Sequence, residues 1–112
     1  MLYELREYTA VPGRFPALVK RFNDHTLELF EKRGIDVVFI AHAELGENST
    51  GEIVYLVRWD SYQQLADTWA AFFVDPEWVQ VKQDSERDGP VVSAVRRRIL
   101  NTNPFERQGG DG

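Results

Sequence analysis

The sequence of 112 residues contains no cysteine and begins without a long hydrophobic run. The lack of cysteine excludes disulfides, thiolate nucleophiles and thiolate-bound metals, and it suits a reducing compartment. The opening residues, MLYELREYT, alternate between apolar and polar, a pattern that neither a secretory leader nor a membrane span tolerates. We therefore expect a cytoplasmic protein that does not enter membranes.

Basic residues and histidines are also scarce. Lysines and arginines number 13 against 18 aspartates and glutamates, and the resulting net charge of -5 gives no general attraction for nucleic acid. The two histidines, His25 and His42, fall on different predicted elements, so they lack the spacing of metal ligands, and a lone histidine has no haem signature. Since the sequence also has no glycine-rich phosphate loop or serine nucleophile motif, we expect no metal and no cofactor.

The first half of the chain predicts a strand, a helix and a β-hairpin. Residues 2–9 alternate in polarity as a strand does, and Pro12 and Gly13 end that pattern. From Phe15 the apolar residues recur at helical spacing as far as Gly34, a predicted C-cap. Two segments rich in β-branched residues, 35–45 and 53–59, flank a polar loop and predict the hairpin.

The second half predicts a helix and a last strand. Ser61 and Gln64 resemble a capping box, which starts a helix that ends near Asp75. Pro76 suits the first position of a further helical turn, and residues 91–100 alternate as a strand. We expect a single domain over residues 1–105, followed by a flexible tail over residues 106–112.

This order of elements, strand-helix-strand-strand-helix-strand, is typical of an α+β ferredoxin-like sandwich with a four-stranded antiparallel sheet. Two helices cover only one face of such a sheet. The segments 35–45 and 53–59 nevertheless carry apolar residues on both of their alternating faces. Because a sheet that is apolar on both sides must be covered on both, we expect a second copy of the chain on the other face, and hence a homodimer.

Four segments of the chain resemble the NIPSNAP family of dimeric α+β barrel proteins: MLYELREYTAVPGR, HTLELFEKRGI, IVYLVRWDSYQQ and DPEW. The similarity runs from about Met1 to Phe105, and the Asn103-Pro104-Phe105 ending is also similar to the family's exit from its last strand. Family members often continue with a serine-proline pair, where this chain has Glu106 and Arg107.

The resemblance implies a ferredoxin-like subunit whose sheet packs against its twin, with a small-molecule pocket between sheet and helices. The wider structural relatives include cofactor-free monooxygenases, isomerases and cyclases of secondary metabolism, haem-binding enzymes, and proteins without known catalysis. A shared fold raises the expectation of such activities without assigning one.

Three polar residues, Glu4, Arg6 and Tyr8, share one face of the first predicted strand. As catalytic groups, Arg6 would hold an anionic or carbonyl oxygen while Glu4 accepts a proton. As structural groups, Glu4 would pair with Arg6 or with the arginines of the last strand and fix the strand register. We favour the structural interpretation, because buried charges are mostly explained by their pairing.

Either histidine can act as an acid or a base near neutral pH, and His25, at the edge of the first helix's apolar stripe and expected over the sheet, is our first catalytic candidate. We expect His42 to contact substrate, together with Tyr3, Tyr8, Tyr55, Trp59, Trp69 and Trp78. Aromatic residues at these spacings are more often core. Arg96, Arg97 and Arg98 alternate across the last strand, where they guard a sheet edge rather than bind phosphate.

Two functions from different classes remain open. The first is a metal-free enzyme of specialised or catabolic metabolism, of the cofactor-independent oxygenase, isomerase or cyclase type, with a pocket between sheet and helices. The second is a ligand-binding or accessory dimer without catalysis. A dimer whose polar interior serves only structure is a third interpretation.

Overall fold

The computed structural model describes residues 1–105 and residue 107, and its elements follow the predicted order. The strands are β1 (Leu2–Ala10), β2 (Asp36–His42), β3 (Glu52–Trp59) and β4 (Val92–Asn101). The helical segments are α1 (Phe15–Arg21), η1 (Phe22–Thr26), α2 (Leu27–Lys32), α3 (Tyr62–Phe73) and α4 (Pro76–Ser85). The expected tail, apart from residue 107, lies outside the described residues.

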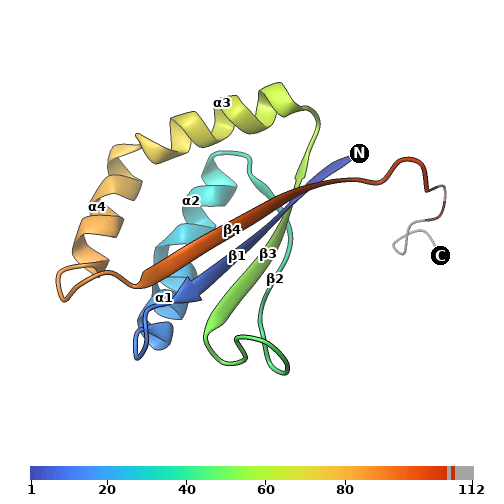
Figure 1. The fold of residues 1–112 in the computed structure, drawn as a ribbon. Coiled ribbons are helices and arrows are strands. Elements are labelled where there is room, and N and C mark those ends of the chain that lie inside the picture. Colours follow the sequence, from blue (N-terminus) through green and yellow to red (C-terminus); the bar gives the residue numbers. More distant parts are fainter. Residues whose placement is uncertain (106, 108–112) are drawn as a thin grey trace.

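The four strands form one antiparallel sheet in the order β2-β3-β1-β4 (Figure 1). β1 therefore lies inside the sheet between β3 and β4, and the arginine-rich β4 is an edge strand, as the sequence predicted. The opposite edge, β2, has an irregular register between Val37 and Phe39, where Val38 has no partner in β3. The ferredoxin-like α+β architecture is thus confirmed.

The segments α1, η1 and α2 form one continuous helix, which we call the first helix and which changes its winding in the middle. At η1 it becomes a π-helix, in which the Leu27 N–H donates to the carbonyl of Phe22, one residue further back than in an α-helix. The helix ends as predicted at Gly34, whose φ of 72° is in the left-handed region that glycine tolerates. The N–H of Ile35 donates to Phe30 and that of Gly34 to Glu31, the two bonds of a Schellman motif.

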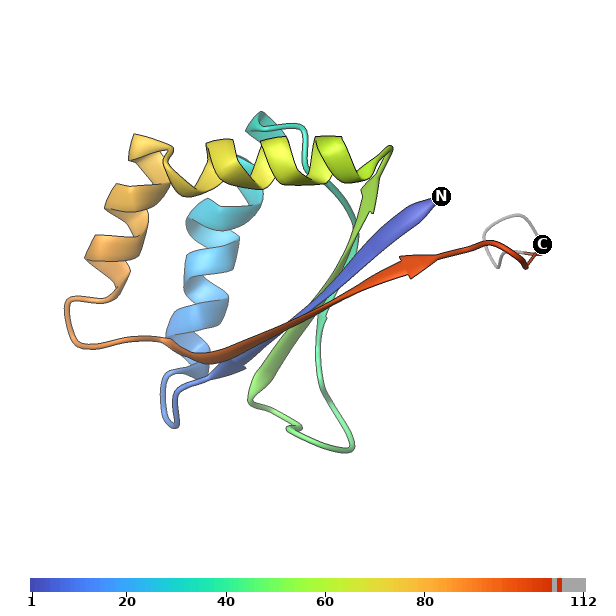
Figure 2. The ribbon, with the colours of Figure 1, turned by 45° about the horizontal axis from the view of Figure 1, so that its top comes forward.

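All the helices lie on one side of the sheet (Figure 2). The hydrophobic core lies between these helices and the sheet. A connected set of buried aromatic rings forms its centre, with Phe22, Phe30 and Trp69 from the helices and Tyr55 and Trp59 from β3. Most of these rings meet edge to face, the arrangement that adds to the benefit of apolar burial. The aromatic residues of β3 and α3 are therefore mainly core.

The other side of the sheet, which we call the open face, has no helix over it among the described residues. Its centre is apolar, because Phe39, Leu56 and Leu5 lie in one row across β2, β3 and β1. Ion pairs flank this row on both sides. Arg58 of β3 pairs with Asp36 at 2.8 Å, and Arg96 of β4 pairs with Glu7 at 2.7 Å.

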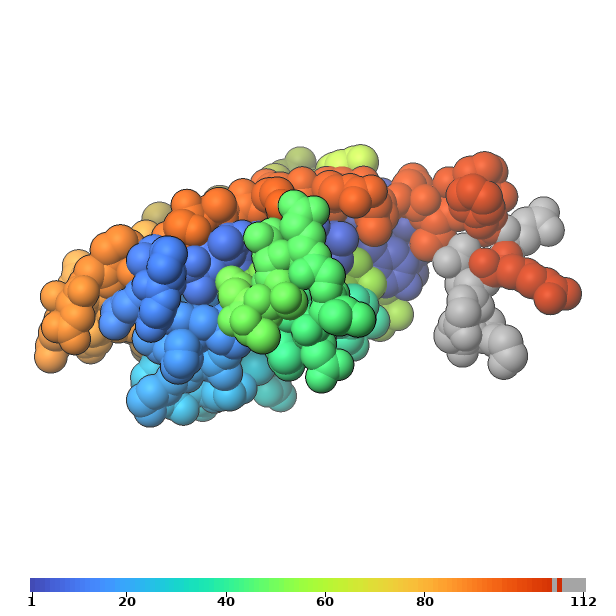
Figure 3. Space-filling model, turned by 60° about the horizontal axis from the view of Figure 1, so that its bottom comes forward, coloured from blue at the N-terminus to red at the C-terminus, as the bar shows by residue number. Residues whose placement is uncertain are grey.

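Two boundaries differ from the sequence-based expectation. β2 stops at His42 rather than Leu45, because Thr50 donates its N–H to Ala43 and closes a loop, which stands out in green at the front of Figure 3. The helical turn expected at Pro76 is a ten-residue helix, α4. Its N-cap is Asp75, whose carboxylate accepts the Glu77 N–H at 2.8 Å and the Arg33 guanidinium at 2.7 Å.

The predicted start of α3 provides a stability test. The Ser61 hydroxyl accepts the Gln64 N–H at 3.1 Å, and the Gln64 side chain accepts the Asp60 N–H at 2.6 Å. We expect Ser61→Ala to lower the free energy of unfolding in urea by about 1 kcal/mol, since it removes the cap bond. Ser49→Ala, in the loop between β2 and β3, is the control, and an equal loss in both variants would contradict this role of Ser61.

Candidate functional site

The carboxylate of Glu4 is completely buried, accepts three hydrogen bonds and forms an ion pair with Arg97. One oxygen, Oε1, accepts from the indole nitrogens of Trp59 at 3.0 Å and Trp69 at 2.8 Å. The other, Oε2, accepts from Arg6 at 2.9 Å and lies 2.8 Å from the Arg97 Nε in an ion pair. Both oxygens are thus occupied by partners within the protein, so the arrangement does not favour Glu4 as an acceptor of a substrate proton.

Arg6 lies beside Glu4 and is held by two tyrosines. Its Nε donates to the hydroxyl of Tyr55 at 2.9 Å, its Nη2 donates to that of Tyr8 at 3.1 Å, and its guanidinium carbon lies 4.5 Å from the Trp69 ring centroid. Burial by itself lowers the pKa of Arg6, but the interactions with Tyr55, Tyr8 and Glu4 outweigh it and hold that pKa above the ordinary value. Arg6 is therefore a permanent buried cation.

The geometry of this cluster agrees with the structural interpretation of the first strand. Both pairings that the sequence suggested for Glu4 are present, one with Arg6 in β1 and one with Arg97 in β4. The side chains of Arg6 and Glu4 are 7% and 0% exposed, so a lost partner would leave a charge without water. The cluster thus joins β1, β3, β4 and α3 through one carboxylate.

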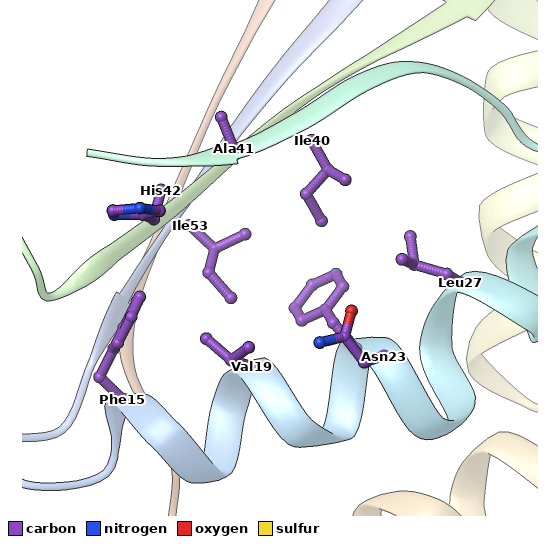
Figure 4. Close-up of a pocket in the computed structure, with 9 residues that line it drawn as sticks. Phe15, Val19, Asn23, Leu27, Ile40, Ala41, His42 and Ile53 are labelled. Carbon is purple, nitrogen blue, oxygen red and sulfur yellow. The ribbon is translucent and has the colours of Figure 1, made fainter. Parts of the chain in front are cut away.

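A separate apolar cavity of about 380 Å³ lies between β2 and the first helix. Figure 4 shows Phe15, Val19, Asn23 and Leu27 extending from the helix toward Ile40, His42 and Ile53 of the strands, while the Ala41 side chain points away. The cavity is open to solvent at the sheet edge, because Ile40, His42 and Asn23 are exposed. Its volume is within the range of small-molecule sites.

The helical wall of the cavity contains the π segment. Phe15, Val19, Asn23 and Leu27 recur at intervals of four residues, which the wider η1 turn keeps on one side of the helix. The same turn leaves Phe22 and Thr26 buried in the core. Short π segments occur frequently at functional sites, so this departure from regular winding marks the cavity as the stronger candidate for ligand binding.

The predicted site residues fall into separate groups. Tyr8, Tyr55, Trp59 and Trp69 join Glu4 and Arg6 in the buried cluster, and Trp78 packs on Phe72 with ring centroids 5.1 Å apart. His42 alone reaches the apolar cavity, where its ring centroid lies 6.2 Å from that of Phe15.

One placement from the sequence was wrong. His25 is exposed on η1 and lies with Lys20 and Asp84 in a cleft between the first helix and α4, instead of over the sheet. The reason is that the π turn buries Phe22 and Thr26, brings Asn23 to the cavity and leaves His25 exposed. Tyr3 lies opposite Arg58 and Leu100 on the open face, away from both Glu4 and the cavity, and its contact with substrate stays a prediction.

Sequence reasoning missed Asn23 and Ile40, which bring one amide and one exposed apolar side chain to the cavity. The available signal was the recurrence of side chains every four residues from Phe15 to Leu27. It was difficult to recognise because the same helix also carries the apolar stripe that faces the core. Among residues 1–105 and 107, no three His, Cys, Asp or Glu side chains are grouped so that they can hold a metal ion. Within the same residues, no helix has both the length and the apolar character needed to cross a bilayer.

Comparisons with known proteins identify similar chains. A family model described as NIPSNAP matches residues 3–107. A protein from Agrobacterium tumefaciens is 26% identical, with 94% of this chain and 96% of that one covered and a TM-score of 0.78. An uncharacterized NIPSNAP-like domain protein from Burkholderia xenovorans is 16% identical, with 96% and 89% covered and a TM-score of 0.80.

More distant similarity extends to an antibiotic biosynthesis monooxygenase of known structure. It is 11% identical, with 93% of this chain and 100% of that one covered and a TM-score of 0.58. At this identity the likeness shows the fold alone. No curated protein matches the chain.

Removal of the Glu4 charge tests the buried cluster. We expect Glu4→Gln to lower the free energy of unfolding by about 3 kcal/mol, because it leaves the buried Arg6 cation without its carboxylate. Urea unfolding followed by tryptophan fluorescence measures this loss. Glu28→Gln, on the exposed side of α2, is the matched control. A Glu4→Gln variant whose stability stays within about 0.5 kcal/mol of the parent would contradict the assignment.

Proposed function

This chain belongs to the NIPSNAP family, and we propose that it is a homodimeric small-molecule-binding protein that holds an apolar ligand in the cavity beside β2. The observation on which the proposal depends is the apolar cavity of about 380 Å³ between the first helix and the sheet. The resemblance to dimeric α+β barrel proteins supports a dimer, which is therefore part of the proposal.

The lining of the cavity selects the ligand. Phe15, Val19, Leu27, Ile40 and Ile53 offer hydrocarbon and aromatic surface, which favours a ligand that is itself apolar. Polar atoms are few, and the side-chain groups are the Asn23 amide and the His42 ring. Because they come from opposite walls, as Figure 4 shows, they can orient a single carbonyl or hydroxyl group on an otherwise apolar molecule.

A catalytic form of the proposal assigns the proton transfer to His42. Of the nine residues that line the cavity, His42 has the titratable side chain, and an imidazole can serve as acid or base near neutral pH. This assignment moves the catalytic role from His25, Arg6 and Glu4 to a residue that was predicted only to contact substrate. It describes a metal-free reaction of the isomerase or cofactor-independent oxygenase type.

The open face supports the dimer. Its row of Phe39, Leu56 and Leu5 is apolar, and Phe39 is 46% exposed in the single chain. Removing such a row from water is favourable, and the flanking ion pairs resemble the polar rim of a protein interface. A second copy presents the same surface by symmetry, so both chains can cover their open faces at once.

Filling the cavity tests ligand binding. We expect the neutral fluorescent probe N-phenyl-1-naphthylamine to bind the parent protein, and Val19→Trp to weaken that binding by about tenfold or more, because the indole occupies the space. Val74→Trp, at an exposed valine after α3, is the control and should bind the probe as the parent does. Equal titration curves for both variants would exclude this cavity.

Charging the open face tests the dimer. We expect multi-angle light scattering at micromolar concentration to give the mass of two chains for the parent and of one chain for Leu56→Arg, since an uncompensated charge inside an interface opposes association. Val74→Arg carries the same charge away from the sheet and should remain a dimer. A monomeric parent chain that is well folded would refute this part of the proposal.

A further inference from the structure

A second cleft, of about 410 Å³, lies between β4 and the helices and shares no lining residue with the apolar cavity. Its floor is formed by Arg6 and Tyr8 of β1 and by residues 92–95 of β4. Arg21 of α1 and residues of α3 and α4, which include Trp78, form the opposite wall. Figures 1 and 2 both show α4 beside the start of β4, where this cleft lies.

The two arginines of the cleft are buried but incompletely paired. Arg21 is 5% exposed, and its Nε has no hydrogen-bond partner. Its Nη1 donates to the Ser85 hydroxyl at 3.2 Å and meets Glu86 only at 3.9 Å. Burial therefore lowers the pKa of Arg21, and Glu86 offsets only part of that effect. Arg6 uses three of its five N–H groups, on Tyr55, Glu4 and Tyr8.

Tyr8 adds a free hydroxyl hydrogen. The hydroxyls of Tyr8 and Tyr55 lie 2.9 Å apart, and each also accepts a bond from Arg6. Tyr55 is fully buried, and this burial is the main cause that raises its pKa. The Tyr55 hydroxyl therefore stays protonated. The Tyr55 hydrogen must therefore point to Tyr8, because a buried donor without an acceptor is costly. The Tyr8 hydrogen is then left for a group inside the cleft.

The cleft thus combines donors and cations on one side with apolar surface on the other. Arg6, Arg21 and Lys82 line it together with one carboxylate, Glu86, and Glu4 lies behind Arg6, so cations outnumber carboxylates here although the chain as a whole has a net charge of -5. The Trp78 ring, 5.2 Å from the Arg21 guanidinium carbon, and the exposed Phe73 and Val95 provide the apolar surface.

We propose that this cleft binds an organic carboxylate with an aromatic or aliphatic body. The carboxylate oxygens accept hydrogen bonds from Tyr8, Arg6 and Arg21, and the body of the ligand packs against Trp78 and Val95. A carboxylate fits because every free polar hydrogen here needs an acceptor and a guanidinium matches its two oxygens. Glu86, which makes one long contact with Arg21, turns toward solvent when the ligand binds.

The test uses isothermal titration of the full chain with 2-naphthoate and its neutral analogue 2-naphthamide. We expect saturable binding of the carboxylate and binding of the amide that is weaker by about tenfold or more, since bonds to a charged partner are the stronger ones. Inorganic phosphate, which lacks the apolar body, should bind more weakly than 2-naphthoate. No saturable 2-naphthoate binding, or equal affinity for the acid and its amide, would overturn the proposal.

Variants then locate the site. Arg21→Met, which keeps an unbranched apolar stem and removes the guanidinium, should weaken 2-naphthoate binding by about tenfold, while Lys20→Met on the exposed side of α1 should not. Val95→Trp, at a half-exposed position, fills the cleft and tests the site even if Arg21→Met fails to fold. Unchanged binding in Val95→Trp would refute this location. Val19→Trp, which blocks the apolar cavity, should leave 2-naphthoate binding intact, so the two sites are tested separately.

Discussion

A buried carboxylate governs the arrangement of this fold. Glu4 is surrounded by two indole N–H groups and two guanidinium groups, which come from β1, β3, β4 and α3. An ionised group inside a protein is tolerated only when it is paired with an opposite charge and hydrogen-bonded. The four elements must therefore meet at one point with the register that the structure shows. Any shift of β1 by one residue would turn both Glu4 and Arg6 to the open face and leave the indole N–H groups of Trp59 and Trp69 in the core without their acceptor.

This constraint also explains how the helix side of the sheet is divided. The column of Tyr8, Phe22 and Tyr55 rings, with neighbouring centroids 5.5 to 5.7 Å apart, stands between the apolar cavity at β2 and the cationic cleft at β4. One sheet face thus presents two environments of opposite chemistry. The arginine beside Glu4 gives the second environment its charge, so a group needed for folding also provides surplus N–H donors for binding.

Much of the fold follows from local sequence patterns. The alternation in β1, the Gly34 cap and the Ser61-Gln64 box predicted the elements, and the apolar character of both faces of β2 and β3 predicted an uncovered side. The ion-pair interpretation of Glu4 was also available, since Arg97 lies on a strand that the topology brings next to β1. The role of a buried charged residue can therefore be predicted from the sequence when a residue of opposite charge lies on a strand that the topology brings beside it.

The sites were harder to predict because they depend on departures from regular periodicity. Ideal helical spacing placed His25 over the sheet, whereas the π turn moves it outside and brings Asn23 to the cavity. The cleft at β4 could not be predicted from the sequence for another reason. Arg21 belonged to the polar side of its helix by pattern, and only the position of α4 buries it beside Trp78.

The π turn also bears on how the length of the chain can change. It contains one residue more than a regular turn needs, within a helix whose two ends are fixed by Arg14 at its start and by the Gly34 cap at its end. A deletion of one residue between 22 and 26 would therefore be absorbed by regular winding rather than by the sheet. Natural or engineered variants of that kind would reshape one wall of the cavity while the strand register stayed in place.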